Sequence, residues 1–326
     1  MRYVVVGSGA IGGGVGGLLH RAGLATTLVA RGEHLAVLRA GGLRLTVGHD
    51  EEVTVPVPTV GSLAEVAWTD DTVVLLAVKS QHTAGAIAGL EPHRPASVPV
   101  VSLQNGVCNE RALLRHVEHV HGVTVMMPAS HLSPGRVTIH SAGRPGLLDV
   151  GRYPGGVDAV DEAVAADLVT AGFDSVPRPD VMAWKHRKLL MNLGNAVDAA
   201  CRPGDDAAEL VDRCRAEGEQ VLAAAGIPVT SEADDRARRG ELLRPLVDRD
   251  GVGSSSWQSV QRRTGDVEAD HLNGEVVLLG RLHGVPTPAN ELTRRTVHDV
   301  VRRGAPPRTV SAAGLLETLD AQSARS

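Results

Sequence analysis

The hydrophobic positions near the start of the chain form two short apolar runs with a glycine-rich segment between them. Tyr3 to Val6 is a β-branched run, as expected of a strand that is buried on both faces. Ala25 to Val29 reads as a second strand, and the residues from Ala10 to about Ala22 continue as a helix. The chain is therefore predicted to open with a strand, a helix and a strand.

Strand patterns recur through the first half of the chain and then stop. Further predicted elements are helices at 33–39 and 158–171 and strands at 43–47, 53–57, 72–78, 98–103, 123–127, 137–140 and 147–150. Residues 173–176 could close the sheet, and Pro177 and Pro179 then break the pattern. From Val181 onward, apolar residues recur only at the helical spacings of three and four.

This organisation predicts an α/β fold with two domains. Residues 1–179 are expected to form a Rossmann-type doubly wound domain, and residues 180–326 an all-helical domain. A length of 326 residues is sufficient for two domains and a sizeable core. The helical half could form a homodimer through an apolar face, although no heptad pattern supports one.

Composition and charge exclude several classes of protein. A net charge of −5 and an aromatic content of 2% provide neither the basic surface nor the stacking residues that nucleic-acid binding requires. The apolar run 73–78 is far too short to span a membrane. Cys108, Cys201 and Cys214 are distant from one another and odd in number, which fits a reducing cytosol and predicts a cytoplasmic protein.

The histidines do not predict a metal centre. His116, His119 and His121 form the only dense group, and no carboxylate or cysteine pattern completes a site around them. We therefore expect no metal, and we place these histidines at a solvated helix end.

The glycine-rich segment has the G-x-G-x-x-G pattern at the point where the first strand turns into the first helix. Its residues are Gly7, Ser8, Gly9, Ala10, Ile11 and Gly12. Gly7 would allow the tight turn, Gly9 the approach of a pyrophosphate to the backbone, and Gly12 close packing of helix and strand. A dinucleotide would then place its pyrophosphate on the positive helix N-terminus.

Arg31, at the end of the second strand, favours NADP(H) over NAD(H). Enzymes that select NAD usually carry an acidic residue at this position, which bonds the ribose 2′-hydroxyl. A guanidinium instead suits a 2′-phosphate by charge and by bidentate geometry. The alternative is that Arg31 is only a solvated loop residue. Flavin enzymes share the glycine pattern, but no further flavin-type signal accompanies it here.

Two polar residues follow buried strands directly. Lys79 comes after the strand at 72–78 and Asn105 after the strand at 98–103. Ligands of doubly wound sheets bind beyond the carboxyl ends of the strands. Lys79 could instead be solvated, and Asn105-Gly106 could be only a turn, but their shared placement favours a role in binding.

One predicted helix of the second half carries a polar stripe. At 100° per residue, Lys188, Asn192 and Asn195 fall within roughly 60° of each other, and Lys185 lies near the edge of that sector. Buried lysine and amide groups need partners, which a cleft against the nucleotide domain would supply. A lysine there could protonate a carbonyl oxygen. The alternative is a hydrogen-bonded polar group within the core.

A second polar cluster follows in the helical half. It comprises the serine-rich stretch 253–258 and the segment 268–274, which contains Glu268 and Asp270. Serines often cap helices and acids often lie in the first helical turn. From the residues alone, this cluster is no more than a candidate wall of a substrate site.

Taken in order, a series of short motifs covers most of the chain. They are Gly7-Ser8-Gly9-Ala10-Ile11-Gly12, Arg31-Gly32, Val78-Lys79-Ser80-Gln81-His82-Thr83, Leu103-Gln104-Asn105-Gly106-Val107, Lys188-Leu189-Leu190-Met191-Asn192, Ser254-Ser255, Glu268-Ala269-Asp270 and Leu272-Asn273-Gly274. In their order and spacing they resemble the ketopantoate reductase (2-dehydropantoate 2-reductase) family.

The resemblance implies a role for each of these residues. NADPH would bind through the glycine motif and Arg31, and Lys79 and Asn105 would lie on the nicotinamide side. Lys188 would be the general acid at the 2-oxo oxygen, assisted by Asn192 and Glu268. The implied substrate-binding residues are Asn105, Lys188, Asn192, Asn195, Ser255 and Glu268. The reaction would be reduction of 2-dehydropantoate to pantoate, on the route to coenzyme A.

The substrate half departs from the family pattern. Asn195 comes three residues after Asn192 where the family has four, and Ala196 takes the expected place. Lys185 is a second lysine near the site, but Lys188 keeps the four-residue step to Asn192. An apparent extra residue between 258 and 268 leaves open whether Ser254, Ser255 or Ser256 meets the substrate. Another 2-oxo acid, an opine-type substrate, or NADPH binding without catalysis therefore stay as alternatives.

Overall fold

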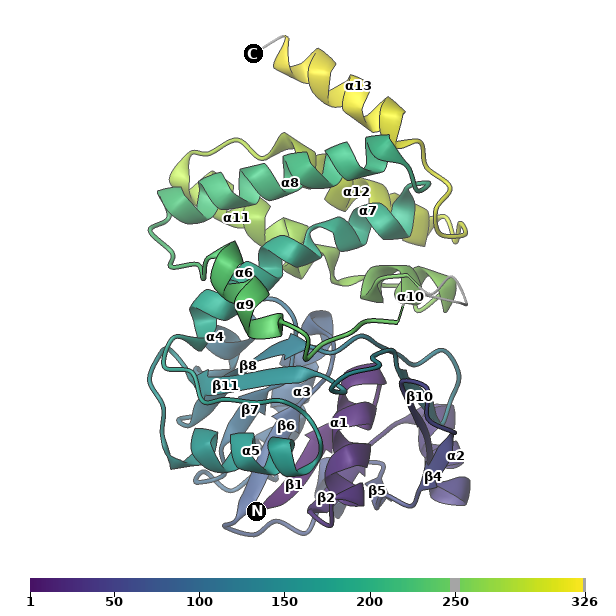
Figure 1. Cartoon of the computed structure of the whole chain (residues 1–326), viewed down its shortest axis with the longest axis vertical. Coiled ribbons are helices and arrows are strands. Elements are labelled where there is room, and N and C mark those ends of the chain that lie inside the picture. Colours follow the sequence, from purple (N-terminus) through teal and green to yellow (C-terminus); the bar gives the residue numbers. More distant parts are fainter. Residues whose placement is uncertain (247–252, 325–326) are drawn as a thin grey trace. The chain divides into compact units, whose positions relative to one another are not determined.

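The chain forms two compact units in the computed structural model, which describes residues 1–246 and 253–324 (Figure 1). The first unit contains residues 1–185 and also residues 231–246, and the second contains residues 186–230 and the described chain from Gly253 onward. The predicted domain boundary between residues 179 and 180 stays a prediction, since the first unit also includes residues 231–246, which lie far from that boundary along the chain.

A seven-stranded sheet organises the first unit. Its strands are β1 (Arg2–Val6), β2 (Ala25–Val29), β5 (Thr59–Val60), β6 (Thr72–Leu76), β7 (Val100–Ser102), β8 (Val120–Met126) and β11 (Leu147–Arg152). The order is β11-β8-β7-β6-β1-β2-β5, and every neighbouring pair is parallel except β11 with β8. This is the doubly wound order, in which the chain reverses direction across the sheet between β1 and β6. The predicted fold class is confirmed.

Helices cover both faces of this sheet. They are α1 (Ala10–Arg21), α2 (Gly32–Gly41), α3 (Thr83–Leu90), α4 (Asn109–Leu113) and α5 (Ala159–Thr170), with short 3-10 turns η1 (Leu63–Glu65) and η2 (Ser80–His82). In β1, Tyr3 and Val5 belong to the core that contains residues of α1 and α5. Val4 and Val6 belong to the opposite core, with residues of α3 and α4. Alternating side chains of one strand therefore supply both cores.

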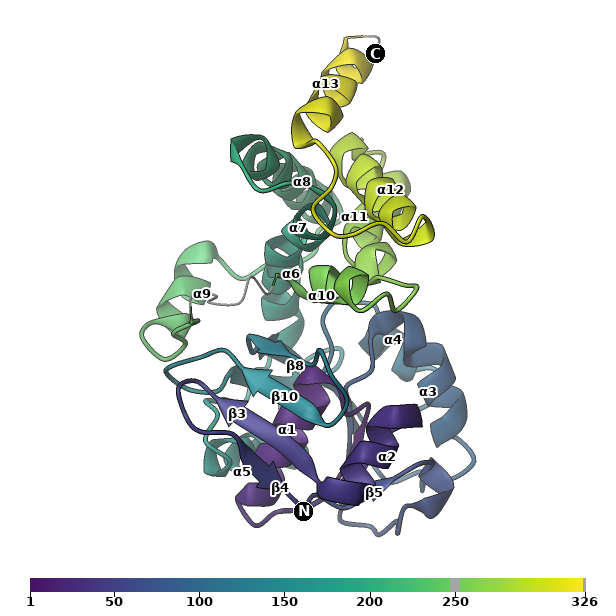
Figure 2. The ribbon, with the colours of Figure 1, turned by 90° about the vertical axis from the view of Figure 1, so that its right-hand side faces the viewer.

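A second, four-stranded sheet belongs to the same unit and was not predicted as a separate sheet. It has the order β4-β3-β10-β9, from β3 (Leu43–Val47), β4 (Val53–Val55), β9 (Ala129–Ser130) and β10 (Arg136–Ile139). Its buried apolar residues belong to the core that contains residues of α1. Figure 2 shows β3 and β10 beside α1. Residues 173–176 form no named strand and contribute a single bridge, from Asp174 to Leu147.

The second half of the chain is helical, as predicted. Its helices are α6 (Val181–Asn192), α7 (Gly194–Ala200), α8 (Asp205–Ala224), α9 (Glu232–Arg239), α10 (Ser255–Gln261), η3 (Glu268–His271), α11 (Asn273–His283), α12 (Pro288–Arg302) and α13 (Ala312–Ser323). In the second unit, α8 packs against α11 and α13 (Figure 2). Among the described residues, no helix is both long and apolar enough to cross a membrane.

Residues 231–246, which we name the strap, pack as part of the first unit. The strap consists of α9 and an extended stretch that pairs with residues 140–144. The backbone N–H of Ala142 donates to Arg244 O at 2.9 Å, and that of Arg144 donates to Leu242 O at 2.8 Å. The strap therefore joins a first-unit loop that precedes it by about a hundred residues.

Candidate functional site

The glycine turn, residues 7–12, has the local geometry that its sequence predicts. Gly7 has a φ of +99°, and a Cβ at this position would lie 2.9 Å from Val78 N. At Gly12 a Cβ would come within 2.0 Å of Gly7 O, so α1 can pass this close to β1 only without a side chain. A Cβ at Gly9 would meet nothing within 4 Å. The backbone at Gly9 is therefore open to a close-approaching group.

A histidine that the sequence did not single out holds this turn. The Nε2 of His34, in α2, lies 2.8 Å from Ser8 O, and its Nδ1 accepts from the backbone N–H of Gly135 at 2.9 Å. One ring nitrogen therefore donates and the other accepts, which requires the neutral imidazole. Burial lowers the pKa of His34, and the bond to Ser8 only partly opposes this shift.

Arg31 lies two residues after the end of β2, as the sequence predicts, and is the N-cap of α2. Its side chain is exposed and forms no ion pair with another described residue. The strand that precedes it pairs directly with β1, so Arg31 and Gly7 follow neighbouring parallel strands. A guanidinium at this edge is available to an anionic ligand.

The loops that carry Lys79 and Asn105 are tied together. Lys79 is the N-cap of η2, after β6, and Asn105 follows β7. The carbonyl oxygen of Asn105 accepts from Asn109 Nδ2 at 3.0 Å and from Ser80 Oγ at 3.4 Å. Asn109 Nδ2 also reaches Ser80 Oγ at 3.1 Å. The structure therefore joins the two predicted ligand loops at the carboxyl ends of neighbouring strands.

Lys185, the second lysine near the predicted site, is committed to partners inside the first unit. Its Nζ donates to Gln104 O at 2.7 Å and to Val123 O at 3.1 Å, and pairs with Glu110 Oε1 at 2.8 Å. The ammonium therefore has two hydrogen-bond acceptors and one carboxylate counter-ion, all within the first unit. This arrangement supports the choice of Lys188, and not Lys185, as the candidate acid.

The predicted continuous helix through Lys188, Asn192 and Asn195 is wrong at its end. Helix α6 stops at Asn192, and α7 begins at Gly194. The N–H of Leu193 reaches Leu190 O at 3.4 Å, which is a three-residue step in place of the helical four. Lys188 and Asn192 share one face of α6, and Asn195 lies beyond the break, in α7.

Asn192 has the environment expected of a ligand-binding amide. Its side chain is 6% exposed, and its Nδ2 is buried without a hydrogen-bond partner among the described residues. A buried donor without a partner costs about 1–3 kcal/mol. The cost would be recovered by a bound acceptor.

The three serines of the predicted substrate wall have different environments. Ser254 is the N-cap of α10; its Oγ accepts from Trp257 N and donates to Asn195 O at 3.1 Å. Ser256 is buried, at 2% exposure. Ser255 is only half-buried, and its Oγ accepts from Asn195 Nδ2 at 3.5 Å. The side chains of Ser255 and Asn195 are therefore hydrogen-bonded to each other.

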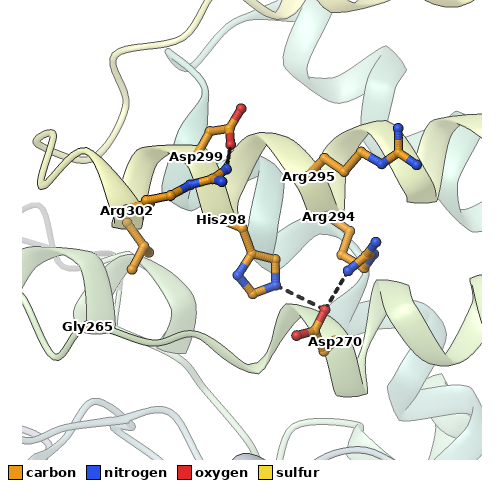
Figure 3. Close-up of a pocket in the computed structure, with 8 residues that line it drawn as sticks. Gly265, Asp270, Arg294, Arg295, His298, Asp299 and Arg302 are labelled. Carbon is orange, nitrogen blue, oxygen red and sulfur yellow. Dashed lines mark hydrogen bonds and ion pairs between the residues drawn. The ribbon is translucent and has the colours of Figure 1, made fainter.

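The segment that contains Glu268 is held by its neighbour Asp270. Glu268 is 6% exposed within η3. Asp270 accepts from Arg294 Nη1 at 2.7 Å and lies 3.0 Å from His298 Nε2, at a polar hollow of about 620 Å³ (Figure 3). Burial raises the pKa of Asp270, but the bonds from Arg294 and His298 outweigh it and leave the pKa lower than usual. Asp270 therefore fixes η3 to α12 through these two contacts.

The prediction that His121 lies at a solvated helix end is wrong. His121 lies in β8 with 0% exposure, and its Nδ1 is 2.7 Å from Asp161 Oδ1. His121, Asp158 and Asp161 have potential ligand atoms within 4.8 Å of one another. Asp158 and Asp161 already accept backbone N–H groups in the capping box of α5. The sequence missed this group because its members are up to 40 residues apart.

Two sequence profiles match the chain. The profile described as ketopantoate reductase PanE/ApbA matches residues 3–155, and that of the C-terminal part of the same family matches residues 180–301. A 2-dehydropantoate 2-reductase of Halobacterium salinarum is 32% identical over 318 residues, which cover 93% of this chain and 98% of the relative.

Solved structures show the same fold. A PanE/ApbA family ketopantoate reductase from Ralstonia eutropha JMP134 superposes with a TM-score of 0.78 at 28% identity, covering 93% of this chain and 99% of that chain. D-Mandelate dehydrogenase, solved with NADH and anilino(oxo)acetate, gives a TM-score of 0.77 at 21% identity, with coverage of 93% and 99%. The second likeness shows the fold alone.

Proposed function

Because the chain belongs to the ketopantoate reductase family, we propose that it reduces 2-dehydropantoate to pantoate with NADPH. The observation that carries the substrate side of this proposal is the buried Nδ2 of Asn192, one helical turn from Lys188, which has no hydrogen-bond partner in the part of the chain that the structure describes. It provides a hydrogen-bond donor for an oxygen of the substrate beside a candidate proton donor.

The family uses a nicotinamide dinucleotide, and we assign NADPH from the residues around the glycine turn. The open backbone at Gly9 and the N-terminus of α1 suit a pyrophosphate. The exposed Arg31, at the end of β2, suits a 2′-phosphate. Lys79 and Asn105, after β6 and β7, would line the nicotinamide side.

Each candidate site residue of the second unit would then have its own role in the reaction. The bound nicotinamide would supply a hydride to C2 of the 2-oxo acid. Lys188 would give a proton to the carbonyl oxygen as the alcohol forms. Asn192 would orient that oxygen, and Glu268 would accept from the terminal hydroxyl of the substrate. Asn195 and Ser255 would bind the carboxylate as a pair, since Asn195 Nδ2 already faces Ser255 Oγ.

Loss of nicotinamide absorbance with purified protein, NADPH and 2-dehydropantoate tests the proposal directly. Lys188→Ala should lower kcat by about 10²- to 10⁴-fold, the usual contribution of general acid catalysis, while NADPH affinity stays close to that of the wild type. Arg215→Ala removes one positive charge from an exposed pair on α8 and should keep wild-type rates. Equal loss of turnover and NADPH binding in Lys188→Ala would contradict the general-acid role.

A second candidate is a reductase of the same fold for another 2-oxo acid. The observation in its favour is Ala196, which is buried in α7 at the place where the family pattern has an amide. A panel of 2-oxo acids with different tails separates the two candidates. Faster turnover of another acid would replace 2-dehydropantoate as the substrate, and NADPH binding without any turnover would indicate a sensor.

A further inference from the structure

The ion pair between Lys185 and Glu110 is among the most deeply buried charged contacts of the first unit. Their side chains are 2% and 0% exposed, and Nζ lies 2.8 Å from Oε1. Lys185 Nζ also donates to Gln104 O at 2.7 Å and to Val123 O at 3.1 Å. The ammonium therefore links α6 to the loop after β7, to the middle of β8 and to α4.

Stability alone gives a weak reason for such a pair. Removing two charges from water costs several kcal/mol per ion in real proteins, and replacing a buried pair by apolar side chains is often neutral or stabilising. Removing one partner is different, because it leaves an uncompensated buried charge and costs about 3–5 kcal/mol. The two effects can be separated by experiment.

The acceptor at Gln104 indicates what the pair does. Gln104 O is the carbonyl of the peptide that leads directly into Asn105. The side chain of Gln104 is also fixed, since its Nε2 donates to Val78 O at 2.8 Å and to Thr83 Oγ1 at 2.9 Å. Lys185 thus holds one side of the Asn105 turn, and the residues after β6 hold the other.

We propose that Lys185, neutralised by Glu110, is a positioning residue that sets the orientation of Asn105 through the Gln104 carbonyl. The inference rests on the proposed function, in which Asn105 lies on the nicotinamide side. No proton transfer is assigned to Lys185, whose side chain is 2% exposed and whose Nζ contacts two backbone carbonyls and the Glu110 carboxylate within the first unit. It acts by holding a backbone oxygen that no apolar side chain could hold.

Two variants separate positioning from stability. Lys185→Met leaves Glu110 buried and unpaired, so both the melting temperature and kcat should fall. Lys185→Met/Glu110→Leu removes the unpaired charge and should recover most of the melting temperature. It cannot restore the bond to Gln104 O, so kcat should stay low by on the order of 10²-fold, the effect of a misplacement of about 1 Å. A double variant with wild-type kcat would overturn the proposal.

A matched control accounts for loss of stability as such. Leu168→Ala removes a fully buried side chain of α5 and should destabilise the first unit by about 2–5 kcal/mol. At a temperature where all variants are folded, its kcat should equal that of the wild type. If Leu168→Ala loses as much kcat as the double variant, lowered stability explains both, and the proposal fails.

Two further readouts keep this inference distinct from the substrate assignment. The fluorescence of bound NADPH reports the nicotinamide environment without any substrate, and it should change in the double variant but not in Leu168→Ala. The pH profile of the residual kcat should keep the wild-type shape, because Lys188 remains. Unchanged fluorescence, or loss of the alkaline limb of the pH profile, would overturn the proposal.

Absence of 2-dehydropantoate turnover in the wild type would contradict only the assignment of the substrate. The value of kcat is then measured with the 2-oxo acid that the protein reduces.

Discussion

Arg31 is the residue on which the choice between the two nicotinamide dinucleotides depends. Arg31→Asp removes the guanidinium that would bond a 2′-phosphate and adds a carboxylate that can accept from a 2′-hydroxyl. A hydrogen bond to a charged group contributes about 1.5–3 kcal/mol. We therefore expect the ratio of kcat/KM for NADPH to that for NADH to fall by roughly 10- to 100-fold. Initial rates with each cofactor measure this ratio.

The control for Arg31→Asp is Arg115→Asp, which makes the same change of charge at an exposed position after α4. Its cofactor ratio should equal that of the wild type. An unchanged ratio in Arg31→Asp as well would mean that another side chain reads the 2′-phosphate.

Residues with local constraints were predictable, and residues with distant partners were not. Gly7 and Gly12 were recognised because the turn they form lies within one short motif, and their φ and packing follow from it. Lys185 was noted, but its acceptors lie 62 and 81 residues away, and nothing in the sequence pairs them with it. His121 was misplaced for the same reason, since Asp161 is 40 residues away.

At the scale of elements, periodicity predicted most helices and strands but not their interruptions. The strand at 25–29 and the helix at 158–171 lie within a residue of their observed bounds. Helix α6, in contrast, ends at Asn192 and α7 begins at Gly194, where a Cβ would lie 3.2 Å from the side chain of Val211 in α8. The hydrophobic pattern does not show this break, and the predicted angle between Asn192 and Asn195 stays a prediction.

His34 bonds the backbone of two turns, at Ser8 and at Gly135, so the stability of the protein should depend on pH. The pKa of His34 is lowered from its usual value of 6.5 mainly by burial, so the folded chain favours the neutral ring. Its contribution to stability is therefore complete above pH 6.5 and is lost as the pH falls below 6.5 through the folded-state pKa. Protonation of Nδ1 would also remove the acceptor for Gly135 N–H.

Replacing this ring by an amide should remove the pH dependence. In His34→Gln the amide can still donate to Ser8 O and accept from Gly135 N–H, but it does not titrate. We expect the drop in melting temperature between about pH 7.5 and about pH 5.5 to be smaller in His34→Gln than in the wild type. NADPH affinity, measured over the same range, should follow the same order. A drop of equal size in both proteins would show that other groups control this transition.

At the scale of the whole molecule, the two units do not correspond to two continuous halves of the sequence. The strap leaves the helical half and packs with the first unit, where α9 brings Arg238 to two carboxylates. Arg238 bonds both oxygens of Asp149, at 2.7 and 2.9 Å, and one of Asp174 at 2.5 Å. The hydrogen bonds that Arg238 donates to Asp149 raise the pKa of Arg238 above its ordinary value. The amino-acid composition of the strap is that of an ordinary exposed helix, so nothing in the sequence assigned these residues to the first unit.

Arg238→Met should therefore destabilise the protein far more than a neighbouring arginine on the same helix. The Arg238 side chain is 14% exposed and that of Asp149 only 5%, so the variant leaves a buried carboxylate with Arg178 as its remaining cation. Because Arg178 remains, we expect a loss of about 2–3 kcal/mol, below the 3–5 kcal/mol usual for breaking a buried pair. Arg236→Met, at a side chain that is 74% exposed, should change stability by less than about 0.5 kcal/mol. Denaturant unfolding of both variants measures the difference, and limited proteolysis should cut the strap faster only in Arg238→Met. Equal stability of the two variants would mean that the strap is held by its backbone pairing with residues 140–144, and not by the two carboxylates.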